Sequence, residues 1–218
     1  MQLSEKTKNN LKGVMPITKE EREDALASAC MQVKRVLPEF TTKFQNAYSE
    51  NGFYRPIDNV EWTTGFWTGE IWLAYEYGGG DVLLKAAEIQ MQDFLHRIEQ
   101  KICVDHHDMG FLYTPSCVAG YKLTGSGTGK RAALLAADQL KSRFQEKGEF
   151  IQAWGAMGEP ENYRLIIDCL LNVPLLYWAS QETGDESYRQ IADRHVHTTL
   201  ENAVSYTHLR AHETELHL

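Results

Sequence analysis

One carboxylate is of interest because of the residues around it. Asp168 lies in the middle of an apolar segment, residues 162–178, in which apolar side chains recur at spacings of three and four. That spacing predicts a helix that is buried almost all round. A carboxylate in such a place needs a partner or a proton, and burial raises its pKa. Asp168 is therefore a candidate proton donor, and the alternative is a structural aspartate held by hydrogen bonds.

A second candidate group is the sequence His106-His107-Asp108, which directly precedes the apolar residues 109–113. Loops of this kind place acid, base or ligating groups on a rigid frame. Two adjacent imidazoles and one carboxylate lack the spacing of a metal site, so we expect no metal and no other cofactor. The alternative to a functional loop is a polar segment that faces solvent.

Three tryptophans complete the candidates. Trp62, Trp67 and Trp154 offer flat faces of the kind on which sugar rings stack, and two carboxylates beside them fit glycoside chemistry. The alternative for these side chains is ordinary packing in the core.

Helices must carry these groups. Thr18 and Glu21 form a capping-box pattern, and the helix that they begin is expected to run to about Leu37, where Pro38 either stops it or bends it into a continuation over residues 40–45. Pro174 is expected to kink the helix around Asp168. Residues 46–61 and 102–114 are predicted loops. The predicted helices cover residues 18–37, 66–77, 82–101, 115–123, 130–146, 162–181 and 185–202.

The helices follow a repeat. Glycine-containing turns at residues 78–80, 125–129 and 184–185 each connect an aromatic-rich helix to a more polar, amphipathic one. Such helical hairpins bury their apolar faces only by stacking side by side. No strand-like alternation is present. The predicted class is all-α, a toroid or array of helical hairpins, with catalytic groups where the inner helices and their preceding loops meet the central cavity.

The composition narrows the function classes. The 218 residues are 43% hydrophobic, enough for one domain, and the formal net charge of −8 argues against a nucleic-acid partner. No apolar run reaches the roughly 18 residues of a membrane span, and the polar start lacks a signal peptide. The four cysteines have no metal or redox spacing, so we expect mostly buried, reduced thiols in a cytoplasmic protein. His195 and His197, on the last helix, are expected to be exposed.

Four segments together resemble the unsaturated glucuronyl hydrolases, glycoside hydrolase family 88. They are residues 59–69, 106–113, 150–154 and 163–172, and the resemblance extends over about residues 20–204. It implies an (α/α)6 barrel of helical hairpins. It also implies a disaccharide substrate, made by polysaccharide lyases, with a 4,5-unsaturated uronic acid at its non-reducing end. The family hydrates the C4=C5 double bond, and the resulting hemiketal rearranges and releases the second sugar.

The resemblance also assigns roles to single residues. Asp168 matches the general acid/base, which protonates C4 and assists the attack of water at C5. Asp108 matches a second essential carboxylate that contacts the sugar hydroxyls. His107 and Trp62 match sugar-contacting positions, and Trp154 is expected to stack on the ring. Protonating an enol ether needs a protonated acid near neutral pH, which a desolvated carboxyl group supplies.

The chain departs from the family in two ways. The six or seven predicted helices amount to about half of a complete barrel, and the groups expected to bind the uronate carboxylate are absent. Residues 205–218 no longer follow the family. We therefore interpret residues 1–17 as a disordered lead-in, residues 18–204 as a partial barrel domain and residues 205–218 as a non-native tail. The isolated chain is expected to be poorly stable and inactive, and its oligomeric state stays open.

Two alternatives remain. The related unsaturated rhamnogalacturonyl hydrolases have the same barrel, although the His107-Asp108 pair and the region of Trp154 favour the glucuronyl type. A non-catalytic helical binding module would not need a buried Asp168 that faces a cavity.

Overall fold

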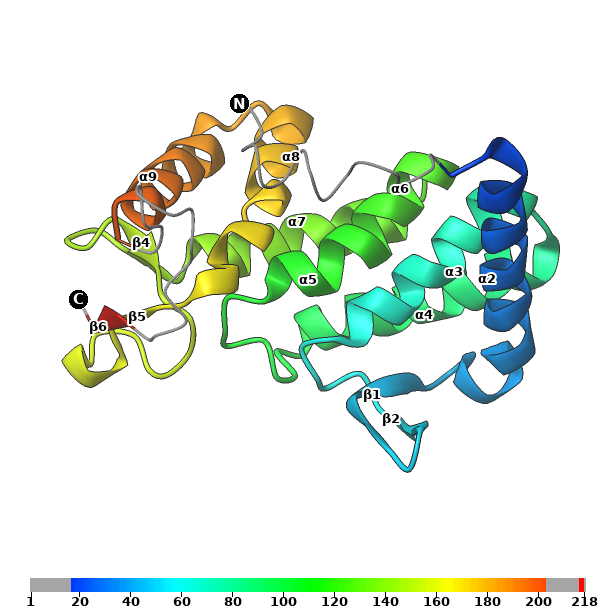
Figure 1. The fold of residues 1–218 in the computed structure, drawn as a ribbon. Coiled ribbons are helices and arrows are strands. Elements are labelled where there is room, and N and C mark those ends of the chain that lie inside the picture. Colours follow the sequence, from blue (N-terminus) through cyan, green and yellow to red (C-terminus); the bar gives the residue numbers. More distant parts are fainter. Residues whose placement is uncertain (1–16, 203–215, 218) are drawn as a thin grey trace, which may run out of the picture.

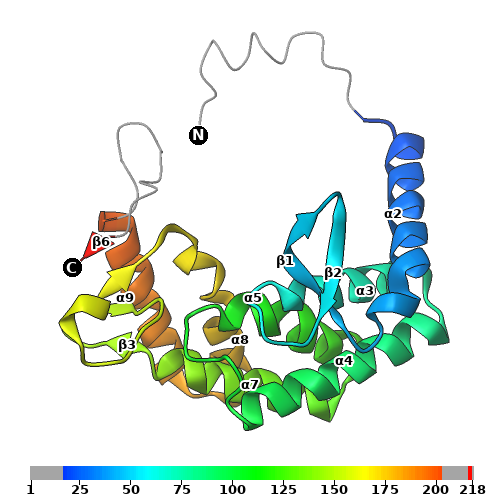
Figure 2. The same ribbon diagram turned by 90° about the horizontal axis from the view of Figure 1, so that it is seen from below.

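The computed structural model describes residues 17–202 and 216–217. The expected lead-in and tail therefore lie almost wholly outside the described residues. Helices dominate and follow one another along an arc, with α2 at one end and α9 at the other (Figure 1, Figure 2). They are α2 (Lys19–Phe40), α3 (Thr64–Gly78), α4 (Asp81–Glu99), α5 (Met109–Tyr113), α6 (Ala119–Thr124), α7 (Gly127–Lys141), α8 (Pro174–Thr183) and α9 (Glu186–Asn202). The prediction of an all-α protein is confirmed.

The first helix begins as expected and ends later. The Thr18 hydroxyl accepts from the Glu21 amide at 3.1 Å, and the Glu21 carboxylate accepts from the Thr18 amide at 2.8 Å, which completes the capping box. Pro38 lies inside α2, which continues to Phe40, so the proline does not stop the helix. Phe40 is buried against Trp67, whose indole Nε1 donates to the Phe40 carbonyl at 2.9 Å.

Short antiparallel hairpins interrupt the helices. Residues 46–61 are not a plain loop, because β1 (Phe44–Glu50) pairs with β2 (Phe53–Ile57) around Asn51 and Gly52, both with positive φ. An Asn-Gly pair between aromatic residues is a hairpin signal that the sequence analysis missed. The other strands have two residues each, too few to show alternation. They are β3 (Phe144–Gln145) with β4 (Phe150–Ile151), and β5 (Arg164–Leu165) with β6 (Leu216–His217).

The segment around Asp168 is not one continuous helix. It runs through β5, then a 3-10 turn, Ile167–Leu171 (η3), and only then into α8. Pro174 is at the start of α8 and does not kink it, since the first turn of a helix needs no proline N–H. The apolar spacing was misleading because Leu165 and Cys169 are buried although neither lies in an α-helix.

The helix before α7 also differs from the prediction. It begins at Met109, six residues earlier than expected, and Pro115 lies in a π-helical turn, Thr114–Val118, between α5 and α6. A proline cannot donate the regular helical hydrogen bond to Phe111, and the wider turn accommodates its ring.

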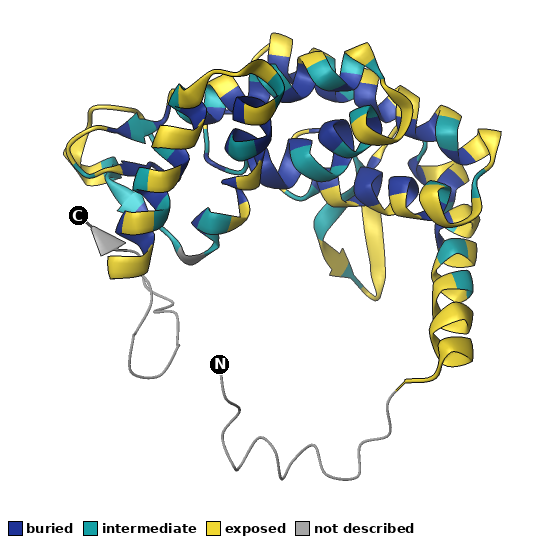
Figure 3. Cartoon of the chain, turned by 90° about the horizontal axis from the view of Figure 1, so that it is seen from above, coloured by how far each residue is buried: buried dark blue, intermediate teal, exposed yellow. Residues whose placement is uncertain are grey.

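The core lies between neighbouring helices of the arc. α3 packs against α4, α4 against α7, α7 against α8, and α8 against α9. Buried residues gather where these helices face one another, whereas the first half of α2 is exposed (Figure 3). Gly79, Gly125 and Gly184 end their helices with positive φ, as the hairpin repeat predicted. None of the helices in the described part of the chain is long and apolar enough to cross a bilayer.

Candidate active site

Three segments lie side by side at one edge of the arc: residues 103–108, 152–155 and 164–172. The His107 amide donates to the Ala153 carbonyl at 2.7 Å, and the Ala153 amide donates to the Arg164 carbonyl at 3.0 Å. Backbone hydrogen bonds therefore connect the loop of His107 and Asp108 to the loop of Trp154 and to the segment of Asp168.

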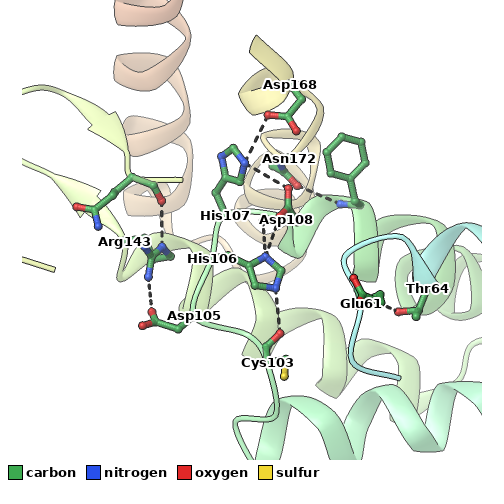
Figure 4. A network of polar contacts seen from close by, with 12 residues as sticks. Glu61, Thr64, Cys103, Asp105, His106, His107, Asp108, Arg143, Asp168 and Asn172 are labelled. Carbon is green, nitrogen blue, oxygen red and sulfur yellow. Dashed lines mark hydrogen bonds and ion pairs between the residues drawn. The ribbon is translucent and has the colours of Figure 1, made fainter. Parts of the chain in front are cut away.

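Arg143 fixes two of these segments to each other. Its fully buried guanidinium donates to the Gln152 carbonyl and to the Gly155 carbonyl, both at 3.0 Å. It also pairs with Asp105, at the start of the histidine loop (Figure 4). Hydrogen bonds to a charged donor are the stronger ones, so the Trp154 loop has a rigid base.

The segment of Asp168 approaches α5 very closely. A Cβ atom on Gly110 would lie 2.3 Å from the Cα atom of Asn172, so only glycine fits there. The buried Asn172 side chain accepts from the Phe111 amide at 3.1 Å. This contact brings η3 to the start of α5, directly after Asp108. The sequence analysis assigned no role to Gly110 or Asn172, although a glycine within an apolar helical run signals such an approach.

Two carboxylates share one imidazole at this junction. His107 Nε2 lies 3.2 Å from Asp108 Oδ1 and 3.4 Å from Asp168 Oδ1 (Figure 4). His107 is buried, while 13% of the Asp108 side chain and 29% of the Asp168 side chain are exposed. Asp168 is therefore more exposed than expected, because the sequence predicted a helix that is buried almost all round. The three residues that the sequence singled out from two distant segments nevertheless converge.

The two carboxyl groups have opposite electrostatic environments. Burial raises the pKa of Asp168, and the nearby Asp108 adds to this effect, while His107 opposes it. Burial would also raise the pKa of Asp108, but hydrogen bonds and charge from His106 and His107 together hold it well below its usual range. A pair whose pKa values are pushed apart can divide the roles of proton donor and fixed anion.

The same cluster has the donor atoms for a cation. The ligand atoms of His107, Asp108 and Asp168 all lie within 4.8 Å of one another. Both ring nitrogens of His107 and the Asp168 Oδ1 atom are buried and have no hydrogen-bond partner among the described residues, although the Asp108 and Asp168 carboxylates lie 3.2 and 3.4 Å from His107 Nε2. The expectation that the site needs no metal stays a prediction.

The tryptophans differ in their placement. Trp62 is 43% exposed and packs edge-on against Phe111, three residues after Asp108, with ring centroids 5.6 Å apart. Trp154 is 38% exposed, and the Arg164 guanidinium lies 5.0 Å from its ring centroid. Trp67 is buried in the core, so core packing was the right interpretation for it. Trp62 therefore has exposed surface near the start of α5, directly after Asp108. Trp154 has exposed surface on the loop that is hydrogen-bonded to the segments of Asp108 and Asp168.

Two expectations for other side chains were wrong. His195 is buried, because α9 packs against β4 and η3, whereas His197 is exposed as predicted. Cys103 is exposed and Cys30 is partly exposed, so only Cys117 and Cys169 are the buried thiols that the sequence led us to expect.

Comparisons with known proteins give a consistent result. No family model matches the chain. An unsaturated chondroitin disaccharide hydrolase of Streptococcus pneumoniae is 48% identical over 188 residues, which are 86% of this chain and 48% of that protein. An unsaturated glucuronyl hydrolase of a Bacillus species is 40% identical over 174 residues, 79% of this chain and 46% of that protein. The chain belongs to the unsaturated glucuronyl hydrolase family.

Solved structures of this family show the same fold. The crystal structure of unsaturated glucuronyl hydrolase from Streptococcus agalactiae superposes with a TM-score of 0.93 at 44% identity, covering 97% of this chain and 53% of that chain. Unsaturated glucuronyl hydrolases have an α/α barrel fold, and the arc from α2 to α9 is part of such a barrel. The chain spans about half the length of the curated relatives it matches.

Proposed function

We propose that the whole protein to which this chain belongs hydrates the C4=C5 double bond of an unsaturated uronyl disaccharide and thereby releases the unsaturated sugar. The observation that carries the proposal is the pair Asp108 and Asp168, which share His107 and whose pKa values are shifted in opposite directions. The names of the relatives support it, and a solved structure of a mutant S. agalactiae enzyme holds dGlcA-GalNAc6S.

In the proposed mechanism, Asp168 is the acid. Its carboxyl group, whose pKa is raised by burial, gives its proton to C4, and positive charge develops at C5 and the ring oxygen. Water adds to C5 and returns a proton to the Asp168 carboxylate. The product is a hemiketal, which opens and releases the second sugar. Proton transfer of this kind contributes on the order of 100- to 10,000-fold to the rate.

The neighbouring residues would bind the sugar. We propose that the ionised Asp108 accepts hydrogen bonds from sugar hydroxyls, since its low pKa keeps it an acceptor. His107 would hold the two carboxylates at a fixed separation and contact the substrate. The exposed faces of Trp62 and Trp154 would stack on the rings, in keeping with their position beside the carboxylate loops.

The test uses a chimera in which residues 19–202 replace the matching part of the S. pneumoniae hydrolase, whose own activity is the positive control. Turnover of an unsaturated chondroitin disaccharide is followed by the loss of its ultraviolet absorbance. Asp168→Asn should lower the rate by roughly 100-fold or more, because an amide cannot supply the proton. Asp24→Asn, at an exposed position of α2, is the matched control. Near-normal turnover by the Asp168 variant would refute the proposal.

A rhamnogalacturonyl hydrolase is the remaining enzyme alternative, and the relatives do not favour it. A pectin-derived unsaturated disaccharide, assayed in parallel, would separate the two. A cytoplasmic location is proposed on the four cysteines, all of which are free thiols in the structure.

A further inference from the structure

A buried arginine at the end of α4 lies between two loops of the site. Arg97 is in the last turn of this helix, and only 1% of it is exposed. The hydrogen-bond acceptors of its guanidinium are all neutral carbonyl, amide or hydroxyl oxygens. A buried charge is tolerated only where such bonds satisfy it, so these contacts strongly constrain the residues that make them. No step of the proposed mechanism uses this side chain.

One group of contacts holds the loop that carries Trp62. Arg97 Nη1 donates to the Asn59 side-chain oxygen at 2.8 Å and to the Glu61 carbonyl at 3.0 Å. The same Asn59 oxygen accepts from the hydroxyl of Thr64, the first residue of α3, at 2.6 Å. Asn59 and Thr64 are buried, whereas Trp62, between them in the chain, is 43% exposed. The guanidinium therefore fixes the peptide bond that leads into Trp62.

A second group of contacts holds the turn that leads into the histidine loop. Arg97 Nη2 donates to the Cys103 carbonyl at 2.8 Å, and Nε donates to the Ile102 carbonyl at 3.2 Å. Lys101 and Cys103 have positive φ angles of 56° and 45°. That conformation is strained for residues other than glycine, and it persists only where the surrounding structure imposes it. The guanidinium supplies part of that constraint.

One side chain connects this turn to Asp108. His106 Nε2 lies 2.9 Å from the same Cys103 carbonyl, and His106 Nδ1 lies 2.9 Å from Asp108 Oδ2 (Figure 4). A shift of Cys103 would therefore move the ring that contacts the carboxylate. Arginine suits the position of Arg97 because its planar fork presents five donors in fixed directions, whereas lysine has one compact ammonium group.

We propose that Arg97 is a positioning residue: it fixes the loop of Trp62 and the loop of His106 and Asp108 to each other. The separation of the exposed Trp62 ring from the Asp108 carboxylate then depends on one buried side chain of α4. The positioning role follows from the contacts of this chain alone. Its consequence for turnover rests on the proposed function, in which both Trp62 and Asp108 bind the sugar.

Hydrogen exchange in the chain as it stands tests the positioning role. Each loop has a reporter amide: Val60 donates to the Asp58 carbonyl at 2.9 Å, and His107 donates to the Ala153 carbonyl at 2.7 Å. Arg97→Lys keeps the charge and loses the fork. Both reporter amides should therefore exchange about tenfold faster in this variant, while the amides of α7 keep their wild-type rates.

Two further variants sharpen the test. Gln90→Met is the matched control, because Gln90 is also buried on α4 but donates to the Phe40 carbonyl at 2.6 Å rather than to either loop. It should not speed the reporter amides more than the amides of α7. Asn59→Ala removes an acceptor on the side of Trp62 alone, and it should speed the His107 amide about threefold, because the guanidinium transmits the change. This variant decides the question if Arg97→Lys does not fold.

Wild-type exchange of the His107 amide in both the Arg97 and the Asn59 variants would overturn the proposal. So would equal acceleration of all amides, including those of α7, because that pattern means global destabilisation. In the chimera, Arg97→Lys should raise KM about tenfold with a smaller loss of kcat, since sugar binding depends on both loops. A lower kcat at unchanged KM would mean only a smaller folded fraction and would contradict the proposal as well. An inactive wild-type chimera would count against the proposed function, and the exchange result would still decide the role of Arg97.

Discussion

His106 supports Asp108 from the side opposite His107. Its Nδ1 lies 2.9 Å from Asp108 Oδ2, and its Nε2 lies 2.9 Å from the Cys103 carbonyl. The Asp108 amide also approaches Nδ1, at 3.1 Å. The hydrogen bond from His106 to the carboxylate helps to lower the pKa of Asp108, so His106 favours the ionised form.

Asp168 should cost the folded chain stability at neutral pH. Its pKa is raised by folding, so the folded state is favoured below the unfolded value of about 3.9 and loses that advantage as the pH rises through the folded value. Asp168→Asn should therefore melt higher than the wild type at pH 8, by on the order of a few degrees, and the difference should shrink towards pH 3.5. Thermal melts of both proteins across this range check the prediction, and an equal gain from Asp24→Asn would contradict it.

At the residue scale, the sequence singled out the side chains that cluster better than the residues that hold them in place. Asp108, His107 and Asp168 became candidates because a carboxylate or imidazole beside apolar residues is unusual, and the family resemblance then assigned a role to each. His106 was left without a role and His195 was expected in solvent, since their partners are backbone groups of Cys103 and Ile151. Which backbone groups lie nearby depends on tertiary packing, and residue type alone does not encode it.

At the scale of elements, close packing decides how the two carboxylates meet. The apolar spacing of residues 162–178 predicted one helix, yet the chain turns twice there so that η3 can lie on α5. An apolar pattern shows which residues are buried but not which kind of element carries them. Strands, 3-10 turns and helices that pack on the same core can all produce it. The helical hairpins were predictable because glycine turns and long amphipathic helices leave a strong local signal.

Gly110 is the position at which this packing can be tested. In Gly110→Ala, the new Cβ atom would meet the Cα atom and the carbonyl oxygen of Asn172 at 2.3 and 2.7 Å, so one backbone must move. We expect a loss of about 1–3 kcal/mol in the free energy of unfolding of the chain, measured by denaturant titration. The chimera should lose activity as well, because the carboxylates separate.

Gly127→Ala is the matched control for this substitution. Gly127 is the first residue of α7, and a Cβ atom there meets nothing within 4 Å, so alanine should be neutral or slightly stabilising. Equal stability of the two alanine variants would show that the approach of η3 to α5 is not the constraint described here.

At the scale of the molecule, the arc has an apolar edge. A groove of about 420 Å³ lies between α2 and α3 and is lined by Leu26, Val33, Leu73 and Tyr77, among others. Leu73 and Met31 are each 65% exposed, although α3 belongs to the aromatic-rich helices that the hairpin repeat places inside a toroid. The family resemblance predicted about half of a complete barrel and named no residues of its edges. The structure was needed to identify the side chains at this edge, because they depend on how α2 packs on α3.

This edge predicts self-association of the 218-residue chain. Burying several exposed leucine and methionine side chains gains about 25 cal/mol per Å² of apolar surface, so copies should associate as concentration rises. Light scattering during size-exclusion chromatography should show the mean mass increasing with concentration, and Leu73→Lys should reduce the increase. Ile89→Lys is the control, because Ile89 is 45% exposed on α4, away from the groove. A chain that stays monomeric at all concentrations, or an equal effect of both lysines, would show that the edge does not drive association.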